Sequence, residues 1–134
     1  MAQLDRVALA RPDTSQALFA PQIPDLIAGE ALDAGAPCYI KAADGKVYMS
    51  SGASANEAAR VHGFTPRAAS AGEPITLLGP GARFRYSAGT LTPGAPYYVA
   101  AAAGRLDTAA TTGGTVKVAF AVNTTDIVVA ALAP

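Results

Sequence analysis

LDAGAPCYIKAADGKV, at residues 32–47, returns at residues 91–106 as LTPGAPYYVAAAAGRL. At one constant spacing the identical pairs are Leu32/Leu91, Gly35/Gly94, Ala36/Ala95, Pro37/Pro96, Tyr39/Tyr98, Ala42/Ala101, Ala43/Ala102 and Gly45/Gly104. So many matches in one register indicate a duplicated structural unit. Each copy has the pattern of a turn, a strand, a tight turn and a second strand, and Asp44-Gly45 is typical of a hairpin turn. The sequence therefore predicts two related units, each containing a β-hairpin.

Further alternating segments extend this pattern along the chain. Turn residues separate expected strands at residues 38–42, 46–50, 61–64, 74–78, 83–86, 97–101, 105–108, 116–122 and 127–132. In the segment 116–122 we expect Val116, Val118, Phe120 and Val122 to share one apolar face. Residues from Phe64 to Ile75 correspond to those from Phe120 to Ile127, so the duplication covers about residues 29–79 and 88–132. We expect an all-β fold, either a small barrel or a sandwich.

One segment favours a helix. Residues 53–60 read ASANEAAR, with Ser54 as a candidate N-cap and Glu57 three residues later, as in a capping box. The segment is short, so tertiary packing would have to stabilise it.

The first 28 residues precede the duplication and form an expected extended arm, followed by the body at residues 29–134. Pro12, Pro21 and Pro24 favour extended backbone there, and residues 4–10 alternate as an edge strand does. The apolar side chains near the end of the arm need a surface to lie on, and they are Leu18, Phe19, Ile23, Leu26 and Ile27. That surface is either the protein's own body or a neighbouring subunit.

The bulk composition limits the classes of function. The 134 residues fit one domain or two small packed lobes. Only 15% are charged, against about 25% in ordinary soluble domains, which either reflects an alanine-rich composition or marks a surface that meets other protein. Ten acidic residues balance ten basic ones without a basic run, so we expect no nucleic-acid partner. No apolar stretch is long enough for a membrane span, and the start of the chain lacks a secretory pattern.

Residues for chemistry are scarce. His62 is the only histidine and Cys38 the only cysteine, which is too few for a zinc site, and Cys38 is expected at a packing position. We therefore expect no enzyme activity, no catalytic or metal site and no cofactor. Arg83 and Arg85 share one strand face, and they either meet partner carboxylates or form a solvated face.

Several motifs are similar to the capsid cement, or head decoration, proteins of tailed bacteriophages. The resemblance covers roughly residues 28–132, and its motifs are residues 28–32 (AGEAL), 35–39 (GAPCY), 44–47 (DGKV), 63–64 (GF), 71–76 (AGEPIT), 91–94 (LTPG), 97–99 (YYV) and Gly104. It implies a virion protein that binds the outer capsid surface and clamps neighbouring major capsid protein subunits. It also leaves room for self-association, for instance as a trimer.

We therefore expect partner-binding residues in the arm and on the arginine strand, namely Arg11, Leu18, Phe19, Ile23, Leu26, Ile27, Arg83 and Arg85. Similar Gly-x-x-Tyr-Tyr repeats occur in phage tail fibre and tail tip modules. The alternative is thus a receptor- or glycan-binding module in which Tyr97 or Tyr98 stacks on a sugar.

Overall fold

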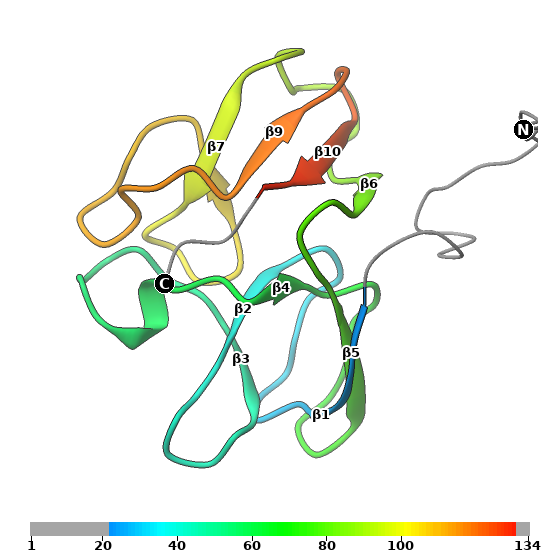
Figure 1. Cartoon of the computed structure of the whole chain (residues 1–134), viewed down its shortest axis with the longest axis vertical. Helices are drawn as coiled ribbons and strands as arrows, with labels where there is room; N and C mark the ends of the chain where they lie inside the picture. The colour runs from blue at the N-terminus through cyan, green and yellow to red at the C-terminus, as the bar shows by residue number, and fades with distance from the viewer. Residues whose placement is uncertain (1–21, 131–134) are drawn as a thin grey trace, which may run out of the picture.

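The computed structural model describes residues 22–130, which form two five-stranded antiparallel sheets (Figure 1). The first sheet has the order β1-β5-β4-β2-β3. Its strands are β1 (Gln22–Ile27), β2 (Pro37–Ile40), β3 (Val47–Met49), β4 (Gly63–Phe64) and β5 (Pro74–Leu78). The second sheet has the order β6-β10-β9-β7-β8. Its strands are β6 (Arg83–Arg85), β7 (Pro96–Val99), β8 (Leu106–Asp107), β9 (Ala119–Ala121) and β10 (Asp126–Val129). The expected all-β fold is confirmed.

The expected duplication is also confirmed, because both sheets have the same strand order. The strand registers agree as well, since Pro37 pairs with Phe64 and Pro96 with Phe120. Equivalent backbone hydrogen bonds recur in both units: Gly35 N to Thr65 O and Gly94 N to Ala121 O, then Lys41 N to Lys46 O and Ala100 N to Arg105 O. The repeated sequence therefore encodes repeated hydrogen bonding as well as repeated turns.

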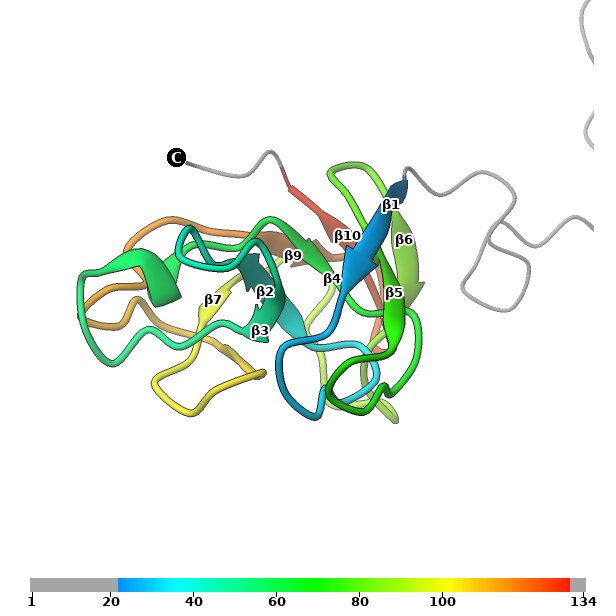
Figure 2. The same cartoon turned by 90° about the horizontal axis from the view of Figure 1, so that it is seen from below.

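Each unit begins one strand earlier than the sequence motifs suggest. β1 pairs with β5 along its length, as β6 pairs with β10, so β1 and β6 are equivalent strands (Figure 2). The arm was expected to extend to residue 28, but residues 22–27 already form a strand of the first sheet. These residues therefore belong to the body and not to the arm. A β-bulge lies between Ile23 and Leu26, where Asp25 has a φ of 64°. This irregularity and the two prolines conceal the strand in the sequence.

Neither sheet closes into a barrel. The two edges of the first sheet meet at a single parallel bridge between Ala28 and Val47, and the Gly29 N–H donates to the Val47 carbonyl. Of the two expected arrangements, packed open sheets describe residues 22–130 better than a barrel does.

Two apolar clusters form the core. One lies within the first unit and contains Leu32, Cys38, Val47, Ile75 and Leu77 among others. The other lies within the second unit and also takes in side chains of the first, namely Val61, Phe64 and Leu78. The rings of Phe64 and Phe84 are 5.4 Å apart across this junction. One face of the first unit is thus buried in the core of the second unit.

Backbone contacts reinforce the junction between the units. Gly52 N–H donates to the Ala100 carbonyl, and Gly104 N–H donates to that of Ser50. A Cβ atom at Gly52 would lie 2.1 Å from Thr111 Oγ1 and 2.7 Å from the Val99 carbonyl oxygen. Only glycine leaves room for this close contact, so the backbones of the two units pack directly against each other at Gly52.

The expected helix is reduced to a single 3₁₀ turn, η1 (Glu57–Ala59). Its N-cap is Asn56, whose side chain accepts from the Ala58 N–H. The expected capping box with Ser54 is wrong, because the Glu57 carboxylate accepts instead from the backbone N–H of Ala42. Tertiary pairing of this carboxylate thus replaces the local contact that would have extended the helix.

Candidate docking surface

The two faces of the second sheet have opposite environments. Cross-strand pairs place Phe84, Ile127 and Ala121 on the buried face. The pairing places the following residues on the opposite face, which we call the outer face of the second sheet: Arg83, Arg85, Pro96, Tyr98, Phe120, Asp126 and Val128. All of these side chains are exposed or half-buried.

Phe120 is the apolar centre of the outer face and is 40% exposed. The expectation that Phe120 shares one apolar face with Val116, Val118 and Val122 is therefore wrong, because Val118 is buried. Ala119 and Ala121 occupy the inward positions instead. The reason is tertiary, since Phe64 of the first unit fills the same core cluster and leaves these positions to small side chains.

The repeat shows that this face has an equivalent that is covered. By strand register Phe64 corresponds to Phe120, and Leu78 corresponds to Val128. The expected correspondence of Ile75 with Ile127 is therefore wrong, because the register makes Leu77 the equivalent of Ile127. Phe64 and Leu78 are at most 1% exposed because the second unit packs against them. The second unit has no further unit after it within the described residues, so the equivalent face stays open. A terminal repeat normally carries a polar outer face, whereas this one carries a phenylalanine.

Charged groups border the apolar centre. Arg83 Nε lies 3.1 Å from Asp126 Oδ2, which makes an ion pair between an exposed arginine and a half-buried aspartate. Arg85 donates through Nε to the Ser87 carbonyl at 3.4 Å, and within the described residues no carboxylate lies at ion-pair distance from it. The sequence correctly placed both arginines on one exposed face, opposite the buried Phe84. The outer face therefore offers an apolar centre beside a cation with spare hydrogen-bonding capacity.

The other expected partner-binding residues lie elsewhere. Ile23 and Leu26 lie in β1 and are half-buried against the core of the first unit, while Ile27 is 39% exposed. Arg11, Leu18 and Phe19 precede the described residues, as does the expected edge strand at residues 4–10. The structure thus brings together the arginine pair and Phe120, and it uses Ile23 and Leu26 within the body.

His62 has a structural contact that accounts for it. The ring Nδ1 of His62 accepts a hydrogen bond from the backbone N–H of Ile40 at 3.0 Å, and the backbone N–H of His62 donates to the Cys38 carbonyl. Burial and the neighbouring Arg60 hold the pKa of His62 below its usual value, against an opposing effect of Glu57. The ring therefore continues the β-ladder between β2 and the start of β4 in its neutral form.

Cys38 occupies the packing position that the sequence predicts. It is fully buried in the core of the first unit, and burial, with Glu30 and Asp33 nearby, raises the pKa of its thiol to about 12. A nearby carboxylate is engaged by the backbone: Glu30 accepts a hydrogen bond from the Met49 N–H at 2.9 Å. Within residues 22–130 no group of three or more His, Cys, Asp or Glu side chains is placed to hold a metal ion.

The two adjacent tyrosines of β7 point to opposite faces. Tyr97 is 5% exposed and its hydroxyl accepts from the Thr92 N–H at 3.0 Å, whereas Tyr98 lies half-buried on the outer face of the second sheet. They do not form a shared stacking platform.

Comparisons with protein-family models and with curated proteins gave no match to this chain. Among the described residues no helix is both long and apolar enough to cross a membrane.

The sequence missed Phe120, Val128 and Pro96 as members of one exposed surface. A signal was present, because two tandem units that pack through non-equivalent faces leave one copy of each of those faces without a neighbour. What the sequence could not show is which face the units use to pack.

Proposed function

We propose that this chain is a structural virion protein that binds the outer surface of a phage capsid and bridges subunits of the major capsid protein. The observation that carries the proposal is the open outer face of the second sheet, with Phe120 at its centre, whose equivalent in the first unit is fully buried by protein. The resemblance of the repeated motifs to phage capsid cement proteins is the reason for proposing the major capsid protein as the partner. Cementing requires a surface that adheres to the capsid, and the outer face of the second sheet is the surface proposed for this.

The chemistry of the outer face suits a protein partner. Exposed apolar area bordered by polar groups is typical of interaction sites, and aromatic residues and arginine are enriched in such interfaces. Phe120 supplies the anchor, while Arg85 is available to a partner carboxylate. The outer face binds one capsid subunit in this proposal.

The segment before β1 supplies the second contact that bridging needs. It contains Arg11, Leu18 and Phe19, which in this proposal contact a neighbouring capsid subunit. Two linked contacts bind more tightly than either alone, because the second forms at high effective concentration. Association of several copies on the particle, for instance as a trimer, would extend the same arrangement.

The test is to add purified protein to undecorated, expanded phage capsids. We expect the protein to co-sediment with the capsids at a fixed number of copies per particle and to raise the temperature at which the shells rupture. No co-sedimentation, together with an unchanged rupture temperature, would refute the proposal.

A glycan array distinguishes the receptor-binding alternative. A tail-fibre module would give specific glycan binding that is lost in Tyr98→Ala, the one tyrosine of the pair with an accessible ring. The capsid proposal expects no such binding. The geometry of β7 does not favour the alternative, since Tyr97 is buried.

A further inference from the structure

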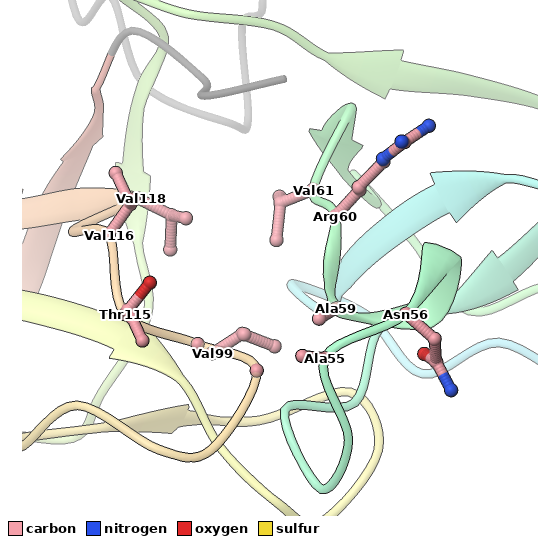
Figure 3. A pocket seen from close by; sticks show the side chains of 11 residues that line it. Ala55, Asn56, Ala59, Arg60, Val61, Val99, Thr115, Val116 and Val118 are labelled. Atoms are coloured by element: carbon pink, nitrogen blue, oxygen red, sulfur yellow. The ribbon is translucent and has the colours of Figure 1, made fainter.

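A half-open pocket of about 280 Å³, which we call the β8 groove, lies beside the edge strand β8 of the second sheet. The β8 groove shares no residue with the outer face of the second sheet. It is also separate from the hollow at the junction between the two units, which Figure 3 shows between residues 55–61 and residues 113–118. Of the described residues that line the β8 groove none is charged, and most carry a hydroxyl group, including Tyr86 and Tyr97.

The first unit shows what covers the equivalent strand edge. Val47 of β3 is the repeat equivalent of Leu106 of β8. Ala28 forms a parallel bridge with Val47, and the Gly29 N–H donates to the Val47 carbonyl at 2.8 Å. An extended piece of main chain therefore pairs with the outer edge of β3.

The second unit lacks this cover because its connection is shorter. Before the repeated leucine it has residues 87–90 in place of residues 27–31, which is one residue fewer. Ser87 Oγ accepts from the N–H groups of Gly89 and Thr90, which folds the connection into a turn. This turn does not pair with β8.

The main chain of Leu106 is consequently only half paired on this side. Its N–H donates to the Tyr86 hydroxyl at 3.0 Å, and Tyr86 lines the β8 groove. The N–H and C=O of one residue in an antiparallel strand point the same way, so the Leu106 carbonyl faces this side as well. Within residues 22–130 no N–H or O–H group donates to that carbonyl.

Two hydroxyl groups add donors to this free acceptor. The Tyr86 hydroxyl accepts from Leu106 N–H and the Tyr97 hydroxyl from Thr92 N–H, so each still has a proton to donate. Burial raises the pKa of Tyr86, against opposing effects of the Leu106 N–H and Arg105, so its hydroxyl keeps that proton at neutral pH. An acceptor beside hydroxyl donors complements a peptide group, which has one N–H and one C=O.

We propose that the β8 groove binds an extended, uncharged peptide segment of a partner protein, which pairs with Leu106 as residues 28–29 pair with Val47. An unpaired strand edge is a template for such a segment, and the uncharged lining would penalise a buried charge. A sugar would also meet hydroxyl groups here, but Tyr97 is 5% exposed and offers no ring face for stacking. The inference goes beyond the proposed function, since the β8 groove is separate from the outer face of the second sheet.

An NMR titration of the whole protein with a short peptide tests the proposal. The probe is acetylated and amidated LIAGQA, which copies residues 26–31 with glutamine in place of the glutamate. We expect saturable shifts of the Leu106 and Thr108 amide signals in the millimolar range. The matched control LIAPQA lacks the N–H that would donate to Leu106, so it should bind roughly five- to tenfold more weakly.

The same titration contains the outcomes that would overturn the proposal. One is the absence of saturable shifts at these amides up to about 10 mM LIAGQA. Equal binding of LIAPQA would exclude main-chain pairing. Saturable shifts with glucose but none with LIAGQA would assign the β8 groove to a sugar instead.

Two protein variants locate the binding. Replacing residues 87–90 by IAGEA, the sequence of residues 27–31, should let the chain cover β8 itself and abolish LIAGQA binding. Phe120→Ser, on the outer face of the second sheet, should bind the peptide as the wild type does. The proposal is overturned if the folded graft still binds LIAGQA at wild-type strength, or if Phe120→Ser loses the binding. If the graft does not fold, the comparison of LIAGQA with LIAPQA on the wild type decides.

Discussion

At the scale of single residues, Cys38 illustrates how burial controls chemistry. Burial, with Glu30 and Asp33 nearby, raises the pKa of the thiol to about 12, so the thiolate is almost absent at neutral pH. We predict that a disulfide reagent at pH 8 leaves the native protein unmodified and labels one thiol per chain in denaturant. Rapid stoichiometric labelling of the native protein would contradict this and show that the core of the first unit opens readily.

His62 makes stability depend on pH. Its folded-state pKa lies below the unfolded value of about 6.5, because of burial and Arg60, so the unfolded chain takes up the proton first. The stability linked to this group is present above about pH 6.5 and decreases as the pH falls through the lowered folded-state pKa.

We therefore predict that wild-type protein loses more unfolding free energy between pH 7 and pH 5 than His62→Gln, which keeps an acceptor but does not titrate. The free energy of unfolding of both proteins is measured by denaturant titration at each pH. The difference between the two proteins removes the pH dependence that comes from the carboxylates, which they share. Parallel profiles would mean that the Ile40 N–H to His62 Nδ1 contact does not select the neutral ring.

At the scale of elements, β1 is the first strand of the body, and the arm is the part of the chain before it. Ile23 pairs with Leu77 and Leu26 with Ile75, and both pairs pack on the first core. We predict that a chain starting at residue 22 keeps the stability of the full chain. A chain starting at residue 28 should lose roughly 3–5 kcal/mol, from the lost aliphatic burial and the exposure of Leu77. Urea unfolding of the two truncations measures this, and equal stabilities would place β1 outside the cooperative unit.

Two equivalent glycines offer a matched test of the junction between units. Gly45 and Gly104 have φ values of 70° and 76°, so alanine at either position costs about 1–2 kcal/mol of backbone strain. A Cβ atom at Gly104 would also lie 2.5 Å from Met49 Sδ of the other unit, whereas one at Gly45 has no neighbour within 4 Å.

Gly104→Ala should therefore destabilise the protein by about 1 kcal/mol more than Gly45→Ala, and Met49→Ala should remove most of that excess. The free energy of unfolding of the single and double variants gives the coupling. Equal costs at both glycines would show that the units are looser at this point than the contacts indicate.

The elements that the sequence predicted are those set by local signals. The hairpins follow from Gly35, Gly45 and their copies, and the strand 74–78 was placed at its observed bounds. The prediction was wrong where tertiary contacts decide. Glu57 binds the Ala42 backbone instead of capping a helix, and Phe120 turns outward because Phe64 fills the core beside Ala119.

At the scale of the whole molecule, the two units share a sequence pattern but differ in what surrounds them. The face that holds Phe64 and Leu78 is buried by the second unit, while the corresponding face of the second unit is open around Phe120. Duplication was evident from the sequence. The candidate surface could be predicted only in part. The alternation of the strand places Arg83 and Arg85 on one face, whereas the exposure of Phe120 depends on how the two units pack.

The most direct measurement is the affinity of Phe120→Ser for undecorated, expanded phage capsids, beside wild-type protein and the exposed-site control Lys46→Ala. Removal of a central aromatic anchor should weaken binding at least about tenfold, with the monomer's Tm nearly unchanged, while Lys46→Ala should bind as the wild type does. If Phe120→Ser binds the capsids as tightly as the wild type, the outer face of the second sheet is not the docking surface.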